Sequence, residues 1–299
     1  MKVDEYLEYL TRVRNYSDET VRAYGDDLAK FSTYIREEEL DYLNLDNSCA
    51  RRFISSLSSS GLAKSSLNRI MSTMKGYYRF LILQKYTEVS PFENVRSLKN
   101  NRYLPDYMFE KEVENIIGLA GAGFFGIRDR FILELLYSTG CRVSETASIS
   151  VSDIDFKDRS VRVSGKGGKE RIVYLGQGAI ESLAEYLPLR SIRADKEDAD
   201  AIDALLLNHR GRRITPRGIA LIVDKYVRQS GITKKISPHS FRHSFATHLI
   251  DHGADIRVVQ EMLGHESLST TQIYTHMGID KLRDVYRRAH PHAEKRNGA

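Results

Sequence analysis

The sequence has little cysteine, no long apolar run and no strong excess of one charge. Only two of its 299 residues are cysteines, Cys49 and Cys141, and they form no Cys-x-x-Cys pair. Neither a disulfide framework nor a thiolate zinc site is therefore indicated. The N-terminal residues alternate charged with apolar side chains, unlike a signal peptide, and no apolar run approaches the ~18 residues that span a bilayer. We expect a cytoplasmic protein with no membrane partner.

The charge balance is modestly basic, with 45 Lys and Arg against 40 Asp and Glu. This excess permits a nucleic-acid partner without requiring one. Hydrophobic residues make up 41% of the chain, and 299 residues are enough for two domains with separate cores.

The first third of the chain has the apolar periodicity of helices. Apolar side chains recur every three or four residues across residues 3–35. A later stretch, residues 64–86, places Lys75 and Arg79 among apolar side chains. These cations either contact an anionic partner or form an ordinary solvated face, and both interpretations stay open. We predict a helical domain over residues 1–88.

The composition then changes, because residues 89–106 are rich in Asn and Arg, contain two prolines and lack periodicity. They predict an interdomain linker. A second domain is expected over 107–290, followed by a frayed tail over 291–299. Its expected elements are helices near 109–120 and 126–138, a β-hairpin over 159–175, a loop or helix end over 187–203, a short strand at 205–208 and helices over 215–289. The predicted fold is mainly α, with a helical N-terminal domain and an α+β second domain that contains a small antiparallel sheet.

Four segments of the second domain combine residues suited to phosphoryl transfer. They are STGCRVSE at 138–145, SGKGGKER at 164–171, SPHSFRHSFATHL at 237–249 and MLGHESLSTTQIYTH at 262–276. Transfer of a phosphodiester without a metal ion requires fixed cations around the non-bridging oxygens. Arg142 and Arg242 suit this role, because a guanidinium binds two oxygens at once and stays charged. Tyr274 supplies an attacking hydroxyl. The phosphotyrosine link keeps the energy for resealing, so no ATP, metal or other cofactor is expected.

Proton transfer and orientation need further side chains. Lys166, at the predicted hairpin tip, can protonate the departing 5′-oxygen. His239 and His265 can assist, because imidazole titrates near neutrality. His239 and Arg242 are three residues apart on a predicted helix and so share one face. Glu145 lies one helical turn after the arginine of the first segment and is expected to orient its guanidinium.

In their order and spacing, the four segments resemble the motifs of the tyrosine recombinase (phage integrase-like) family, most closely those of its Xer branch. The family patterns are T-G-[LC]-R-x-S-E, G-K-G-x-K-x-R, H-x-x-R-H and L-G-H followed by a tyrosine. The resemblance places catalytic roles on Arg142, Lys166, His239, Arg242, His265 and Tyr274. Cys141 and Ala147 stand where leucines are common, which affects no catalytic position.

The resemblance also implies a fold, partners and an activity. The N-terminal helices would form a core-binding, SAM-like domain that grips double-stranded DNA with the catalytic domain in a C-shaped clamp. Lys169 and Arg171 would contact the DNA backbone, as would Lys75 and Arg79. Four protomers, identical or of two kinds, would exchange strands at a specific site through a 3′-phosphotyrosine and a Holliday junction. A second Xer recombinase or a DNA translocase would be a further partner in resolving chromosome or plasmid dimers. Integrases of mobile elements share these motifs, so that alternative stays open, as does the target site.

Other chemical interpretations have less support. Tyr274 alone would mean little among 17 tyrosines. Histidines at 239, 243 and 248 recur at helical spacing, but no carboxylate ligand accompanies them, and Arg242 would repel a cation, so no metal site is expected. GAGFFG at 121–126 matches Gly-x-Gly-x-x-Gly, yet no βαβ unit surrounds it.

Two rival functions remain from the sequence. One is a non-catalytic DNA-binding protein of the same fold. The other is a type IB topoisomerase, which would act as a monomer on any duplex. The amphipathic stretch 278–289 docks either on its own domain or on a neighbouring protomer.

Overall fold

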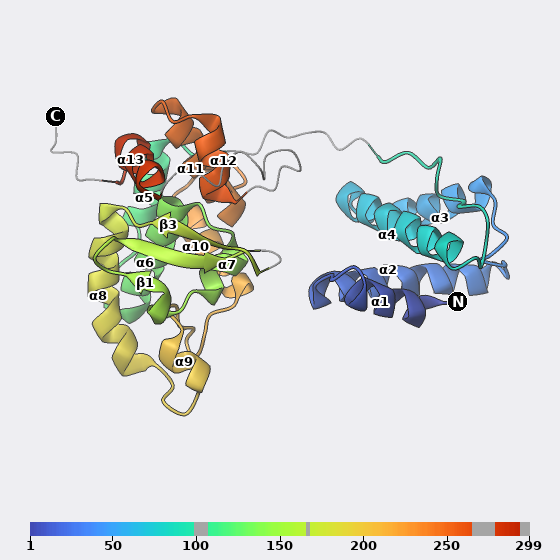
Figure 1. The fold of residues 1–299 in the computed structure, drawn as a ribbon, viewed down its shortest axis with the longest axis horizontal. Helices are drawn as coiled ribbons and strands as arrows, with labels where there is room; N and C mark the ends of the chain where they lie inside the picture. Colours follow the sequence, from blue (N-terminus) through green and yellow to red (C-terminus); the bar gives the residue numbers. More distant parts are fainter. Residues whose placement is uncertain (99–106, 166–167, 265–278, 294–299) are drawn as a thin grey trace. The chain divides into compact units, whose positions relative to one another are not determined.

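The computed structural model describes residues 1–98, 107–165, 168–264 and 279–293. The chain divides into two compact units, Met1–Arg102 and Tyr103–Ala299. Figure 1 shows a first unit made of helices and a second that adds a small sheet. Each unit has its own hydrophobic core. None of the helices in the described ranges is long and apolar enough to cross a membrane.

The first unit contains four helices. They are α1 (Val3–Arg12), α2 (Asp18–Glu37), α3 (Asn47–Ser59) and α4 (Lys64–Leu83). Two of them begin at residues whose side chains accept from the first turn: Ser17 accepts from the Thr20 N–H and Asp46 from the Cys49 N–H. The helical interpretation of this part of the sequence is therefore confirmed.

The core of the first unit is aromatic and includes part of the sequence predicted as linker. Phe31 of α2 packs edge-on against Phe53 of α3, with ring centroids 5.0 Å apart. Phe92 is fully buried beside both rings. Residues 91–98 thus pack against the first unit, although the sequence showed no periodicity there. The predicted domain boundaries stay predictions.

The second unit is built around α6 (Gly123–Thr139), whose last nine residues are all buried. Its other helices are α5 (Glu110–Gly118), α7 (Val143–Ser148), the 3-10 helix η1 (Val151–Asp153), α8 (Gln177–Arg193), α9 (Ala199–Asp203), α10 (Pro216–Gln229), α11 (Pro238–Asp251), α12 (Ile256–Leu263) and α13 (Ile279–Ala289). Figure 1 shows α8 beside α6 and the sheet across them.

The sheet is antiparallel, in the order β1 (Ile154–Asp155), β2 (Ser160–Ser164) and β3 (Glu170–Tyr174). Val161 pairs with Val173, and both point into the core, as the alternation predicted. The predicted hairpin is confirmed. At its end the Gly165 N–H donates to the Lys169 carbonyl at 2.7 Å. The fold class, mainly α with an α+β second unit, is also confirmed.

The stretch predicted as a loop or helix end contains the end of α8, which continues through Pro188 to Arg193, a short loop and α9. Two other local predictions differ from the structure. At 205–208, where a strand was predicted, only Leu207 makes an isolated bridge, to Arg213, although Leu205, Leu206 and Leu207 are fully buried. Residues 291–293, assigned to the frayed tail, pack on α6 instead: His292 Nδ1 lies 3.1 Å from a Glu134 carboxylate oxygen.

The C-terminal helix α13 packs on its own unit in this structure. Tyr286 is buried, and its hydroxyl donates to Ser138 Oγ of α6 at 3.3 Å. Its ring lies 5.7 Å from that of Tyr174, at the end of β3. Of the two docking arrangements left open by the sequence, the structure shows the one within the chain.

Candidate active site

Arg142 is held at the start of a very short helix. It is the N-cap residue of α7, and its backbone N–H donates to a Glu145 carboxylate oxygen at 2.8 Å. Its Nη1 donates to the other oxygen of the same carboxylate, also at 2.8 Å. The Arg142 side chain remains 38% exposed, whereas that of Glu145 is 4% exposed. Glu145 therefore fixes both the backbone and the guanidinium of a residue that still faces solvent.

Arg171 holds Glu145 from the opposite side. Its Nη2 and Nη1 donate to the two Glu145 oxygens at 2.8 and 3.1 Å. Burial alone would raise the pKa of Glu145, but the hydrogen bonds from Arg171 and from the Arg142 N–H outweigh it and lower that pKa to about 2. Glu145 is thus an anion at neutral pH, shared by two arginines. We had expected Arg171 to contact the DNA backbone, but the structure turns its guanidinium inward.

Arg242 lies on α11 and is almost completely buried, yet no carboxylate pairs with it among the described residues. Its Nη1 donates to the Gly140 carbonyl and its Nη2 to the Leu263 carbonyl, both at 2.7 Å. Gly140 ends α6 with φ +58°, and an added Cβ would lie 2.5 Å from the Phe245 ring. Only glycine fits both its conformation and this close approach.

The C-terminal end of α12 joins the same cluster. Arg171 Nε donates to the Met262 carbonyl at 3.0 Å, beside the Leu263 carbonyl that Arg242 binds. Two cations therefore bind the negative end of this helix. Gly264, its left-handed C-cap, packs against the Arg171 side chain. All four sequence motifs thus contribute residues to one cluster, which we call the arginine site: Gly140, Arg142, Glu145, Arg171, Arg242 and residues 262–264.

The arginine site carries an excess of positive charge, with three guanidinium groups against one carboxylate. Burial and the nearby Arg142 lower the pKa of Arg242 to about 10, so it remains charged at neutral pH. An anion placed between Arg142 and Arg242 would relieve this repulsion. This excess of positive charge suits an anion such as a phosphate.

The remaining predicted catalytic residues are placed as follows. His239 lies in the first turn of α11, one turn before Arg242, and is exposed. Lys166, His265 and Tyr274 lie outside the described residues. The structure therefore brings together Arg142, Arg242 and Glu145, and the assignment of catalytic roles stays a prediction.

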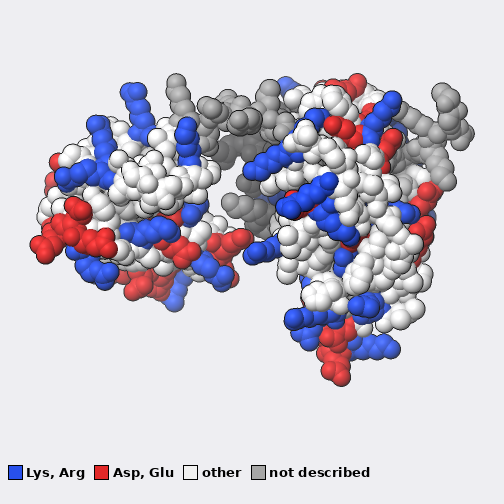
Figure 2. All heavy atoms as spheres, turned by 180° about the vertical axis from the view of Figure 1, so that it is seen from behind, with Lys and Arg blue, Asp and Glu red and all other residues white. Residues whose placement is uncertain are grey.

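The predicted DNA-contacting lysines and arginines outside this site lie on the surface. Arg79 and Lys169 are exposed, and Lys75 is half-buried on α4. Figure 2 shows lysine and arginine side chains on the visible face of both units, mixed with acidic side chains rather than gathered in one continuous patch. This matches the modest net charge of the sequence.

The histidines considered as metal ligands have other surroundings. Within the described ranges, no three histidine, cysteine or carboxylate side chains could hold a metal ion together. His248 is buried and its Nδ1 lies 2.8 Å from the Tyr137 hydroxyl. The His243 ring lies 6.1 Å from that of Tyr107.

Sequence reasoning missed how the arginine site is built. The inward turn of Arg171 follows from an alternation that the sequence does display, because Val163, its partner across the hairpin, is buried. The bonds to the Gly140, Met262 and Leu263 carbonyls leave no such signal, since a backbone acceptor carries no side-chain identity.

Comparison with known proteins extends these observations. A model of the phage integrase family matches residues 106–279, and one of the phage integrase N-terminal SAM-like domain matches residues 3–85. Tyrosine recombinase XerC of Treponema denticola is 41% identical over 97% of this chain and 98% of its own length.

Two solved structures have a similar fold. XerA recombinase is 29% identical, with a TM-score of 0.51 over 97% of this chain and 98% of its own. The second structure is XerH site-specific recombinase bound to a palindromic difH substrate in a post-cleavage complex. Its TM-score is 0.72 over 95% of this chain and 84% of its own. At 22% identity, this second likeness concerns the fold alone.

Proposed function

The chain belongs to the phage integrase family of tyrosine recombinases, and we propose that it cleaves and rejoins duplex DNA at a specific site through a 3′-phosphotyrosine intermediate. The observation that carries this proposal is the arginine site. The positive charges of the buried Arg242 and the half-exposed Arg142 are not balanced by the carboxylate of the site. A scissile phosphate bound there would supply the missing negative charge.

The proposed reaction is an exchange of phosphodiester bonds. The Tyr274 hydroxyl oxygen forms a bond to phosphorus while the bond to the 5′-oxygen breaks. Arg142 and Arg242 hold the non-bridging oxygens, where charge develops in the transition state. His239 or His265 accepts the proton that the Tyr274 hydroxyl loses, and Lys166 gives a proton to the departing 5′-oxygen. Rejoining reverses these steps with a 5′-hydroxyl from the partner strand.

Glu145 and Arg171 act on this reaction by fixing Arg142. A free arginine side chain would lose rotamer freedom when it bound the phosphate. Here a carboxylate held from both sides has already ordered the guanidinium. This preorganisation lets more of the binding energy act in the transition state.

We propose that both units contact the DNA, each through its own surface cations. Lys75 and Arg79 of α4 and Lys169 of the hairpin would neutralise backbone phosphates, so affinity should fall steeply with salt. Each of the two units carries lysine and arginine side chains on its visible face.

The assembly and the biological role of this chain are proposed by analogy with its relatives. One solved structure is a lambda integrase tetramer bound to a Holliday junction. We infer that this chain likewise joins two duplexes as a homo- or hetero-tetramer in the cytoplasm and resolves chromosome or plasmid dimers. A second Xer recombinase and a DNA translocase are its proposed partners.

The proposal is tested with a nicked duplex that carries a candidate site and traps the cleaved state. Wild type should form a protein–DNA adduct that survives denaturation, and Tyr274→Phe should form none. Tyr286→Phe is the matched control, because Tyr286 is buried against Ser138 and should not react. An adduct from Tyr274→Phe would move the nucleophile elsewhere. If every form bound the DNA and none became linked to it, the protein would be a binding module instead.

A further inference from the structure

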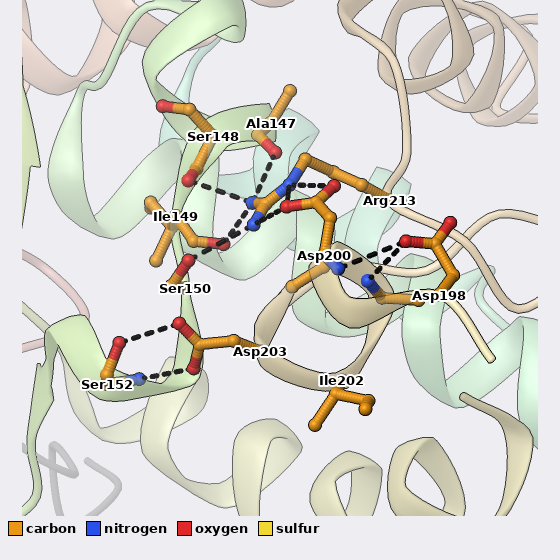
Figure 3. Close-up of polar contacts among 12 residues, drawn as sticks. Ala147, Ser148, Ile149, Ser150, Ser152, Asp198, Asp200, Ile202, Asp203 and Arg213 are labelled. Atoms are coloured by element: carbon orange, nitrogen blue, oxygen red, sulfur yellow. Dashed lines mark hydrogen bonds and ion pairs between the residues drawn. The ribbon is translucent and has the colours of Figure 1, made fainter. Parts of the chain in front are cut away.

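The helix that carries Arg142 is also anchored at its other end, by a residue that the motifs do not include. Arg213 lies in the connection between α9 and α10. Its Nη1 donates to the carbonyls of Ser148 and Ile149 at 2.9 Å each, and to that of Ala147 at 3.4 Å. These are the last carbonyls of α7, and Figure 3 shows them converging on the Arg213 guanidinium.

Arg213 is itself fixed from α9. Its Nε donates to both oxygens of Asp200 at 2.9 and 3.0 Å, and its Nη2 lies 2.8 Å from one of them. The bond from Arg213 lowers the pKa of Asp200. On the next turn, Asp203 accepts from the Ser152 N–H and hydroxyl at 3.2 and 2.8 Å (Figure 3).

Because α7 is very short, the contacts at its two ends determine where it lies. It has six residues, so at 1.5 Å per residue it is only about 9 Å long. A helix this short does not hold its shape without tertiary contacts. Glu145 binds its N-terminal end, and Arg213 binds its C-terminal end with the charge that the helix dipole favours. The contacts at its two ends therefore fix a helix of fewer than two turns, so a change at one end shifts the other.

We propose that Arg213, held by Asp200, is a positioning residue for the reaction: it sets the placement of Arg142 against the scissile phosphate from the opposite end of α7. This inference rests on the proposed function. Arg213 does not touch the reacting atoms, and its loss acts only through the guanidinium of Arg142. Misplacement of a catalytic group by about 1 Å can cost about 100-fold in rate.

The test separates this role from general support of the fold. Single-turnover cleavage is measured with wild type and Arg213→Ala on two nicked duplexes. One has the natural scissile phosphate, and the other has an uncharged methylphosphonate there. Arg213→Ala should cleave the phosphate about 10- to 100-fold more slowly than wild type. On the methylphosphonate the difference should shrink to about threefold or less, because less charge remains for Arg142 to stabilise.

A matched control uses another arginine that binds a carbonyl near the end of a helix. Arg130 Nη2 donates to the Ala120 carbonyl just after α5 at 2.9 Å, away from the arginine site. Arg130→Ala should affect both substrates equally. If Arg213→Ala fails to fold, Arg213→Lys and Asp200→Asn carry the test, with smaller losses that again shrink on the methylphosphonate. Equal losses on both substrates would overturn the positioning role alone. Absence of cleavage by wild type would instead overturn the proposed function.

Discussion

A buried carboxylate of the first unit and the arginine site of the second unit balance their charges differently. In the first unit, Asp27 of α2 is fully buried, and one of its oxygens accepts from Arg69 at 2.6 Å and from Thr73 at 2.9 Å. One anion there meets one cation. In the second unit, Glu145 is shared by Arg142 and Arg171, and Arg242 binds only backbone carbonyls among its described hydrogen-bond partners.

The difference distinguishes a charge that supports the fold from one that is available to a ligand. Burying an ion pair costs desolvation energy that the pair's attraction offsets only in part. A balanced pair such as Asp27 and Arg69 fixes two helices relative to each other. In a cluster where cations outnumber carboxylates, part of the desolvation energy is offset only when an anion binds. The arginine site therefore carries a destabilisation that DNA binding would remove, as is common where a site serves function.

The same substitution in the two units gives the sharpest contrast. Arg242→Lys should slow single-turnover DNA cleavage by about 100- to 1,000-fold, because a lysine offers one point donor where the phosphate needs a planar pair. Arg69→Lys should leave cleavage within about threefold of wild type, since its guanidinium only pairs with Asp27 and the Ala23 carbonyl.

Adduct formation on a nicked duplex at saturating protein measures both rates, and thermal unfolding checks that each variant is folded. The contrast fails if the two variants lose cleavage to a similar degree, in which case Arg242 would serve the fold rather than the phosphate.

A smaller effect concerns the two buried carboxylates, whose pH dependences should have opposite signs. The pKa of Glu145 is lowered to about 2 from an ordinary 4.5, so its contribution to stability is present above pH 4.5 and is lost as the pH falls towards 2. Burial instead raises the pKa of Asp27 above its ordinary 3.8, so the wild-type protein loses stability as the pH rises through that group's titration. Glu145→Gln should cost about 1–3 kcal/mol at neutral pH.

Amide hydrogen exchange on the full chain measures these stability changes, because it reports on the two units separately. The deficit of Glu145→Gln should shrink as the pH falls, and that of Asp27→Asn should shrink as the pH rises. Parallel curves for the two variants would mean that the carboxylates are balanced alike and that the comparison between the units is mistaken.

The same contrast explains what the sequence could predict. The helices and hairpin of both units follow from period and caps, as at Ser17 and in the paired Val161 and Val173. Arg142, Glu145 and Arg242 were singled out because the four motifs combine several side chains suited to one reaction. The alternation along the hairpin indicates that Arg171 turns inward, but its carbonyl partner and those of Arg213 are brought close only by folding. The sequence did not predict the burial of Phe92, because this residue packs against Phe53 and Phe31, which lie 39 and 61 residues earlier in the chain.

The smallest expected effect tests whether the surface cations of the first unit act on DNA at all. Lys75→Ala combined with Arg79→Ala would remove two candidate phosphate contacts from α4. The slope of log affinity against log salt should then flatten by about 1.8, or about 0.9 per contact. Arg12→Ala, which removes one surface cation, is the control, because Arg12 is exposed on α1 and paired with Glu8 at 2.8 Å. Its slope should equal that of wild type when binding is measured by fluorescence anisotropy across a salt series.

An unchanged slope in the α4 double variant would make its charged face an ordinary solvated one. The phosphate contacts would then come from the second unit, which also holds the unbalanced cations of the arginine site.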